Sequence, residues 1–180
     1  MDDLVARPWT EDDAPALEAA VVASTEHLRP WMAWVTQPPP GVEERRAWIR
    51  ERLAQEAAGG DRFRGVFVGG EVAGGGGLHK RVGPGGWELG YWVHVAWTGR
   101  GVATGMVGLL AAEAFADPEI AFVAILHDVA NHASGAVARK AGFTFVDEVD
   151  RAPAAPADTG RDRRWHLTRA DWAAGAGPGA

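Results

Sequence analysis

The sequence predicts one α/β domain in which a mixed, mostly antiparallel central sheet carries helices on both faces. Two observations lead to this fold class. Between residues 87 and 149, segments with the periodicity of a strand alternate with segments with the periodicity of a helix. Upstream, apolar runs at 63–68 and 71–78 flank Gly69 and Gly70, a two-residue turn typical of an antiparallel hairpin. The 180 residues, 47% of them hydrophobic, suit a single core.

The N-terminal third is predicted to hold a short strand followed by helices. These elements are a strand at 4–7, a helix at 14–22, a short helical stretch at 26–34 and an amphipathic helix at 42–58. Thr10 can cap the first helix, and Pro30 shortens or kinks the second. The prolines at 38–40 form a stiff connector. The glycine run at 74–77 is a thin strand with a bulge rather than a phosphate loop, because no helix follows it.

The second half is predicted to alternate strands and helices. The elements are strands at 87–95, 120–126, 143–149 and 163–167, and helices at 101–116 and 133–141. Asn131 can cap the last helix and Gly142 can end it. Residues 1–170 are assigned to the domain, and 171–180, with its small and glycine-rich end, to a disordered tail.

Composition excludes several classes of function. A formal net charge of −6 disfavours nucleic acid as a partner, since binding to phosphate backbones needs a basic face. No apolar run is long enough to span a membrane, and the acidic N-terminus has no secretory signal. The absence of cysteine excludes disulfides, thiolate metal sites and a cysteine nucleophile. His127, Asp128 and His132 lack further ligands, so we expect no metal. A cytoplasmic enzyme, of bacterial origin by its Gly-, Ala- and Arg-rich composition, is indicated.

The segment from 88 to 104 is the most informative stretch. A strand ends in a glycine turn at 98–101, and a helix begins at once. Glycines allow close approach of the backbone, and N–H groups at a helix start lack partners within the helix, so such a turn binds phosphate. Neither the Gly-Lys-Ser/Thr of a P-loop nor the third glycine of a Rossmann fingerprint is present.

This turn, Thr98-Gly99-Arg100-Gly101-Val102-Ala103, resembles the Gln/Arg-x-x-Gly-x-Gly/Ala loop with which the GNAT N-acetyltransferases grip the pyrophosphate of acetyl-CoA. Thr98 stands where Gln or Arg is usual, and because backbone N–H groups make most of the grip, the contact is weakened rather than lost. The resemblance implies acetyl-CoA as cofactor and coenzyme A as product. The residues implied in cofactor binding are Val93, Val95, Thr98, Gly99, Arg100, Gly101, Val102, Ala103, Thr104 and Asn131.

A second motif supports this resemblance. Residues 131–143 are similar to the Asn-x-x-Ser-x-x-Val-x-x-Lys-x-Gly-Phe signature of one GNAT branch. That branch contains the Rim-type ribosomal-protein N-terminal acetyltransferases and their small-molecule-modifying relatives. Segments 4–14, 27–34 and 48–49 also look like this branch, so the likeness covers about residues 4–168. A GNAT-like fold is therefore expected.

The resemblance implies that an amine attacks the acetyl thioester directly in a ternary complex, with the N–H groups of Val93 and Val95 polarising the carbonyl. Glu88 is the candidate base, because strand alternation places it on the same face as Trp92. The alternative is an exposed carboxylate beside a turn. His94 is a second candidate, because histidine is a common acid–base residue, but a solvated or packed histidine at a strand end is the simpler interpretation.

The leaving thiolate needs a proton donor. Many GNAT enzymes use a tyrosine four to seven residues beyond the position of Asn131, and this chain has none there, since its one tyrosine is Tyr91. In this branch a serine takes the corresponding place, which makes Ser134 the candidate. Its alternative is a structural role near the helix start. Asn131 can both cap its helix and touch the pantetheine arm.

Nine tryptophans are too many for the core alone, since a buried indole needs a partner for its N–H. Trp31, Trp34 and Trp92 are predicted to line the acceptor pocket, with core packing as the alternative. We expect a small-molecule or aminoacyl-type amine as acceptor. The alternatives are the N-terminal α-amine of a ribosomal protein and, in another class, a non-catalytic acyl-CoA-binding sensor. A homodimer remains open.

Overall fold

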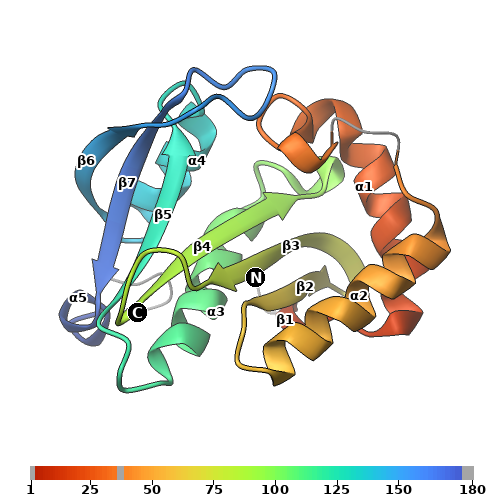
Figure 1. The fold of residues 1–180 in the computed structure, drawn as a ribbon, viewed down its shortest axis with the longest axis horizontal. Coiled ribbons are helices and arrows are strands. Elements are labelled where there is room, and N and C mark those ends of the chain that lie inside the picture. Colours follow the sequence, from red (N-terminus) through yellow and green to blue (C-terminus); the bar gives the residue numbers. More distant parts are fainter. Residues whose placement is uncertain (1–2, 36–38, 176–180) are drawn as a thin grey trace.

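A computed structural model describes residues 3–35 and 39–175 (Figure 1). One sheet of seven strands runs through it in the order β1-β2-β3-β4-β5-β7-β6. Its strands are β1 (Leu4–Pro8), β2 (Arg62–Val68), β3 (Glu71–His79), β4 (Gly86–Val93), β5 (Phe122–Asp128), β6 (Thr144–Asp150) and β7 (Arg161–Thr168). Only β4 and β5 are parallel neighbours, and every other pair is antiparallel. The predicted mixed, mostly antiparallel sheet is confirmed.

Helices cover both faces of the sheet, as predicted. The helices are α1 (Ala14–Leu28), α2 (Val42–Ala57), α3 (Val102–Phe115), α4 (His132–Lys140) and α5 (Arg169–Ala173), with 3₁₀ turns η1 (Glu11–Asp13), η2 (Ala33–Val35) and η3 (Val95–Trp97). On one face α3 buries Met106 and Leu110 against the sheet. On the other face Leu17 of α1 and Ile49 of α2 are buried in a second cluster. None of the helices in the described residues is long and apolar enough to cross a membrane.

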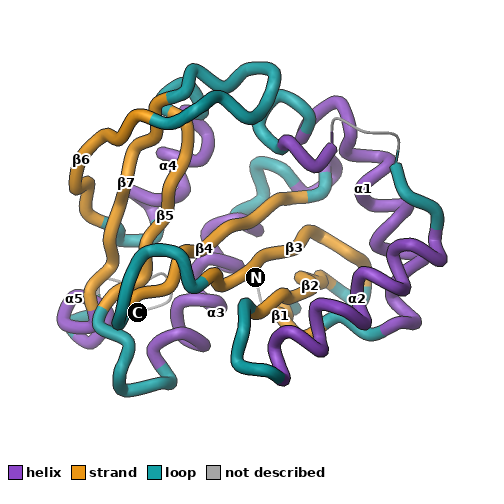
Figure 2. The backbone as a smooth tube through the Cα atoms, viewed as in Figure 1, coloured by secondary structure: helices purple, strands orange, loops and turns teal. Residues whose placement is uncertain are grey.

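The two middle strands diverge along their length. β4 pairs with β5 only over Gly86–Glu88, opposite Phe122–Ala124. Beyond that point β4 continues beside β3, while β5 continues beside β7, so the two strands form a V (Figures 1 and 2). Residues 89–93 of β4 therefore have a strand neighbour on one side only. An opened parallel pair leaves backbone N–H and C=O groups free for a ligand.

The hairpin of β2 and β3 follows the predicted pattern. Gly69 and Gly70 have φ values of 57° and 86°, and positive φ at both central residues defines the type I′ turn that suits a two-residue hairpin. The glycine run lies in β3, and a bulge leaves Ala73 unpaired. A Cβ on Gly74 would collide with the carbonyl oxygen of Trp92 in β4, so glycine permits this close approach.

The structure corrects several predicted boundaries. Helix α1 continues to Leu28, beyond the expected end at residue 22, and it ends where Pro30 can no longer donate a helical hydrogen bond. The second predicted helical stretch is not a separate helix, because residues 26–28 belong to α1 and η2 lies at the end of the stretch. Strand β4 ends at Val93 rather than Val95, because the chain turns at His94, whose Nδ1 accepts a hydrogen bond from the Ala96 N–H at 3.0 Å.

The C-terminal boundary also differs from the expectation. Helix α5 extends past residue 170, and the Trp172 ring lies 5.7 Å from that of Phe115, so this segment packs on the domain. Residue 38 of the predicted connector and residues 176–180 of the predicted tail lie outside the described residues.

Candidate active site

The turn that follows β4 is fixed to both β3 and α1. The His94 N–H donates to the carbonyl oxygen of Ala73 at 2.9 Å, and the Val95 N–H donates to Ser24 Oγ at 3.1 Å. The Ser24 hydroxyl in turn donates to the carbonyl oxygen of Ala20 at 2.7 Å, and the residue is fully buried. One small side chain therefore ties the turn to a helix and sets where the following loop begins.

That loop places a row of free N–H groups at the open end of the V. Gly99 and Gly101 adopt φ values of 71° and 82°, which L-residues rarely adopt. The first backbone bond into α3 runs from the Gly105 N–H to the Gly101 carbonyl at 3.0 Å, and among the described residues the N–H groups of 99–104 have no acceptor. A cradle of this kind, at the positive end of a helix dipole, fits a pyrophosphate.

On the other arm of the V, Ser134 lies in the first turn of α4. Asn131 caps this helix as predicted, with its Oδ1 accepting from the Ser134 N–H at 3.1 Å. The Ser134 Oγ is hydrogen-bonded to the Tyr91 hydroxyl at 2.8 Å. Burial raises the pKa of Tyr91 to about 12, although its hydrogen bond with Ser134 opposes the shift, so the phenol is neutral at physiological pH.

Strand alternation directs the Val93 N–H toward the opening. Hydrogen-bonded and non-hydrogen-bonded positions alternate along an antiparallel pair. The neighbouring His94 N–H points to β3, and Val93, which is paired with Gly74, therefore presents its own N–H to the side that β5 has left. Of the two donors that the resemblance implied, this one faces the V, whereas the Val95 N–H is occupied by Ser24.

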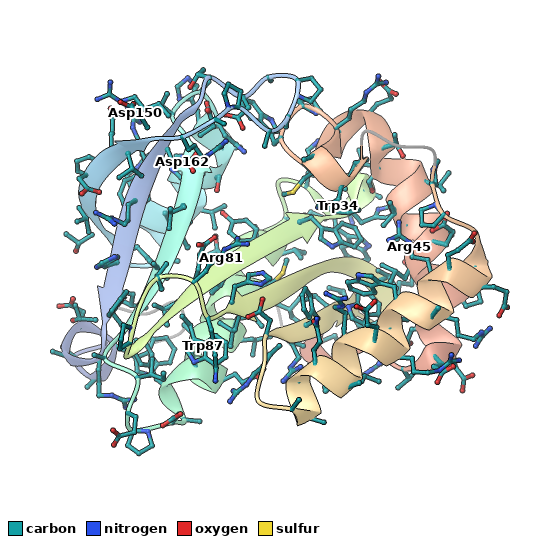
Figure 3. All side chains as sticks on the ribbon, in the orientation of Figure 1. Trp34, Arg45, Arg81, Trp87, Asp150 and Asp162 are labelled. Atoms are coloured by element: carbon teal, nitrogen blue, oxygen red, sulfur yellow. The ribbon has the colours of Figure 1, made fainter. Side chains whose placement is uncertain are left out.

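Glu88 lies where the V begins and on the α1/α2 face of the sheet. Leu89, Tyr91 and Val93 pack with α3, so alternation places Glu88 with Trp92 on the opposite face, as predicted. The Glu88 side chain is 12% exposed and forms an ion pair with Arg81 of the β3–β4 connection. Arg81 is labelled in Figure 3. Glu88 is therefore not the free surface carboxylate of the alternative interpretation.

The structure brings two of the three predicted acceptor tryptophans together. The rings of Trp34 and Trp92 meet edge to face with centroids 6.3 Å apart, and Trp34 is 46% exposed. The Arg45 guanidinium of α2 lies 5.9 Å from the Trp34 ring (Figure 3). Trp31 lies in the turn after α1, and no ring contact joins it to the other two in the described part of the chain.

The connection between β6 and β7 reaches across the open end of the V toward α1 (Figure 1). Arg151 holds this connection in shape through ion pairs with Asp158 and Asp162, and the Ala157 N–H donates to the Pro30 carbonyl at 2.9 Å. The two arms of the molecule are thus joined above the opening.

Two other histidines named in the sequence analysis, His94 and His127, have structural partners. His94 caps its own turn, and the buried His127 accepts from the Trp165 indole N–H at 2.9 Å. Within residues 3–35 and 39–175, no three His, Asp or Glu side chains gather closely enough to bind a metal ion.

Two diverging parallel strands, with a glycine loop of free N–H groups at their open end, define a protein that holds a phosphate-bearing cofactor between the strands. The model of the acetyltransferase (GNAT) domain family matches residues 3–144, so the chain belongs to this family. It is an N-acetyltransferase, and its cofactor is acetyl-CoA. Among curated proteins, none matches this chain.

Solved structures of low sequence identity share the fold. The ribosomal protein L7/L12 α-N-acetyltransferase RimL in complex with coenzyme A is 23% identical with a TM-score of 0.83, over 93% of this chain and 95% of that one. RimJ of Mycobacterium smegmatis is 20% identical with a TM-score of 0.84, over 96% and 90%. The microcin C7 self-immunity acetyltransferase MccE in complex with acetyl-CoA and AMP is 16% identical with a TM-score of 0.85, over 93% of both chains.

Proposed function

We propose that this acetyltransferase transfers the acetyl group to the primary amine of a small-molecule or aminoacyl-type acceptor, by direct attack within a ternary complex. One observation carries the proposal. Along β4, from the end of its pairing with β5 into its free edge, Glu88 and Trp92 lie on one face and Tyr91 lies on the other. An amine can therefore approach a thioester in the V from the face of Glu88, while the departing sulfur meets Tyr91 and Ser134.

In this proposal the cofactor lies along the V with its pyrophosphate on the loop of 99–104. Asn131 and Ser134 would lie beside the pantetheine arm, because the capped start of α4 forms the opposite arm of the opening. The Val93 N–H is placed to polarise the acetyl carbonyl, and preorganised donors of this kind contribute roughly 3–4 kcal/mol to catalysis in other enzymes. Holding both reactants together lowers the barrier further.

The proposed reaction also requires removal of a proton from the amine and stabilisation of the leaving thiolate. An α-amine with a pKa of about 8 is roughly 10% neutral at pH 7, so it needs only modest help to lose a proton. We assign that help to Glu88, either because it accepts the proton, directly or through water, or because its negative charge favours loss of the proton to a neighbouring base. On the other side the neutral Tyr91 phenol can donate to Ser134 Oγ, which leaves the serine hydroxyl hydrogen free to stabilise the thiolate.

The acceptor is proposed to lie against the exposed Trp34 and its partner Trp92, with Trp31 at the edge of the same region. Stacking on an aromatic ring contributes about 0.5–1.5 kcal/mol, which favours a planar amine. The N-terminal α-amine of a ribosomal protein is the second candidate. The likeness in fold to RimL, which is named for such an activity, favours it.

The release of free coenzyme A from acetyl-CoA tests these candidates. The purified protein is assayed with a planar aromatic amine, an aliphatic amine, an aminoacyl amine and a peptide with a free N-terminus. Faster release with the planar or aminoacyl amine supports the proposal, whereas release with the peptide alone supports the second candidate. Tight binding of acetyl-CoA without release for any amine would indicate a sensor and contradict both.

A further inference from the structure

His79, which the sequence did not mark as a candidate, lies beside Glu88 on the α1/α2 face of the sheet. The Nδ1 of His79 is 2.8 Å from Asp61 Oδ2, and the other carboxylate oxygen of Asp61 accepts from the Lys80 N–H at 2.9 Å. Burial opposes ionisation of Asp61, but the hydrogen bonds from Lys80 and His79 hold the pKa of its carboxyl below the ordinary value. A charged carboxylate requires Nδ1 to carry the hydrogen, so Nε2 has a free lone pair.

The Nε2 of His79 lies directly over a glycine pair of the sheet. A Cβ on Gly77 would lie 2.8 Å from this nitrogen, and a Cβ on Gly90 would lie 3.4 Å from it. Gly77 and Gly90 are opposite each other in β3 and β4, so the ring crosses a stretch of sheet without side chains. The side chain is 15% exposed, and Nε2 has no partner among the described residues.

This position coincides with the start of the V. His79 is the cross-strand partner of Glu88, the last residue of β4 that pairs with β5, and Gly90 follows on the same face. Phe63 closes the other side of the imidazole, with ring centroids 5.3 Å apart. The charged groups around the ring are Asp61 and Lys80 at the ends of β2 and β3, Arg81 of the connection, Glu88 of β4 and Arg52 of α2, which lies over Phe63.

We propose that His79 is a further catalytic residue that directly accepts the proton of the attacking amine, with Asp61 as its positioning residue. This inference rests on the proposed function. The nitrogen–carbon bond forms as the carbon–sulfur bond breaks, sulfur leaves with the bonding electron pair, and the proton lost by nitrogen passes to Nε2 and then to solvent. Glu88, held by Arg81, acts through its negative charge, which stabilises the imidazolium.

The test compares three substitutions with an acceptor for which the wild-type protein releases coenzyme A. His79→Gln keeps a hydrogen-bonding side chain but cannot accept the proton, so kcat should fall about 100-fold while the Kd for acetyl-CoA stays unchanged. Asp61→Asn should lower kcat less, because only the tautomer is disturbed. His27→Gln, at an exposed position of α1, is the control and should keep wild-type kinetics.

The pH profile distinguishes His79 from Glu88 as the base. With a weakly basic hydrazide acceptor, which stays unprotonated, the acidic limb of kcat/KM reports the enzyme alone. His79→Gln should abolish that limb. Glu88→Gln should keep it, because the imidazole that accepts the proton is still present. Loss of the limb in Glu88→Gln, with His79→Gln unchanged, would overturn the proposal.

A second measurement separates this inference from the proposed function. Nitrogen chemical shifts of the His79 ring report its tautomer without turnover. We expect hydrogen on Nδ1 in the wild-type protein and redistribution toward Nε2 in Asp61→Asn. Hydrogen on Nε2 in the wild-type protein would overturn the inference even if coenzyme A is released. If no amine supports release although the tautomer is as expected, the proposed function has failed and the assignment of His79 as a base falls with it.

Discussion

The hydroxyl groups of Tyr91 and Ser134 lie 2.8 Å apart and join β4 to α4 across the V. This hydrogen bond couples the one tyrosine of the chain to the serine that the family resemblance implies as proton donor. Neither residue has to act alone, because a neutral phenol that donates to a serine oxygen orients the serine hydrogen toward a third group. The pair is therefore best tested as a unit.

Ser134→Ala should lower kcat roughly ten- to a hundredfold, because a thiolate is already a competent leaving group and proton donation contributes at most about 10²–10⁴. Tyr91→Phe should cost less and should leave the Kd for acetyl-CoA unchanged. If the two hydroxyls act together, the double variant should be no slower than Ser134→Ala. Additive losses in stopped-flow turnover would show that they act separately, and thermal melts control for loss of the α4 start.

Stability at high pH should depend on Tyr91. Burial raises the pKa of Tyr91 to about 12, above the value of about 10 in an unfolded chain. Between these values the unfolded phenol ionises while the folded one stays neutral, so the free energy of unfolding should fall as pH rises through this window. Below pH 10 the residue has no such effect. Denaturation curves of the wild-type protein should lose more stability over this window than those of Tyr91→Phe, and parallel losses would contradict the prediction.

The cofactor loop can be tested by charge alone at Ala103, a half-buried position in the first turn of α3. A glutamate there is favoured by the helix dipole, so Ala103→Glu should fold, yet it places a like charge near the pyrophosphate. We expect at least about a tenfold loss of acetyl-CoA affinity by calorimetry. Ala103→Gln has the same shape and no charge, and should bind nearly as well as the wild-type protein. Equal losses in both variants would indicate steric crowding instead.

Much of the fold could be predicted from local patterns. The two-glycine hairpin, the cap at Asn131 and the glycine turn of 99–101 each depend on a few neighbouring residues, and the structure has them. Thr10 caps the 3₁₀ turn η1 that precedes α1, whose own N-cap residue is Asp13. Element ends were less predictable. Strand β4 ends at the turn of His94, and the Val95 N–H that follows is bonded to Ser24, 71 residues away in the chain.

The candidate site was predictable only where the family motif lies in one segment. Tyr91 was set aside because it is absent from the expected stretch after Asn131, yet the packing of α4 places Ser134 against it from 43 residues away. The pairing of Asp61 with His79 and that of Arg81 with Glu88 likewise depend on how hairpin ends meet. The sequence feature that could have pointed to His79 is the run of glycines before it, because a strand without side chains permits the imidazole ring to lie on the sheet.

Ser24 should control both stability and cofactor binding. Ser24→Ala leaves the Val95 N–H without its acceptor, and the loss of a hydrogen bond of this kind costs about 0.5–1.5 kcal/mol. Because this bond fixes the turn before the glycine loop, acetyl-CoA affinity should fall as well. Thr25→Ala is the matched control, since the Thr25 hydroxyl bonds within α1, to the Val21 carbonyl at 3.1 Å. Chemical denaturation should show a larger loss of stability, and calorimetry a larger loss of acetyl-CoA affinity, in Ser24→Ala than in Thr25→Ala. Equal losses in the two variants would show that the hydrogen bond to Ser24 does not fix the turn.

The proposed contact of the acceptor with Trp34 and Trp92 is tested by comparing an exposed tryptophan with a buried one. Trp34→Ala should raise the acceptor KM roughly two- to tenfold for a planar amine, and less for an aliphatic amine, because only the planar amine loses a stacking surface. The Kd for acetyl-CoA and the free energy of unfolding should change little, since Trp34 is 46% exposed.

Trp9→Ala provides the contrast, because Trp9 is buried and packs edge to face on Phe67 with centroids 5.6 Å apart. It should cost about 3–5 kcal/mol of stability and show no selectivity between the two amines. Trp92→Ala should combine both effects, since this ring contacts Trp34 and also packs against the α1/α2 core. A uniform rise in KM for both amines in Trp34→Ala would mean that the tryptophan shapes the opening without stacking on the acceptor.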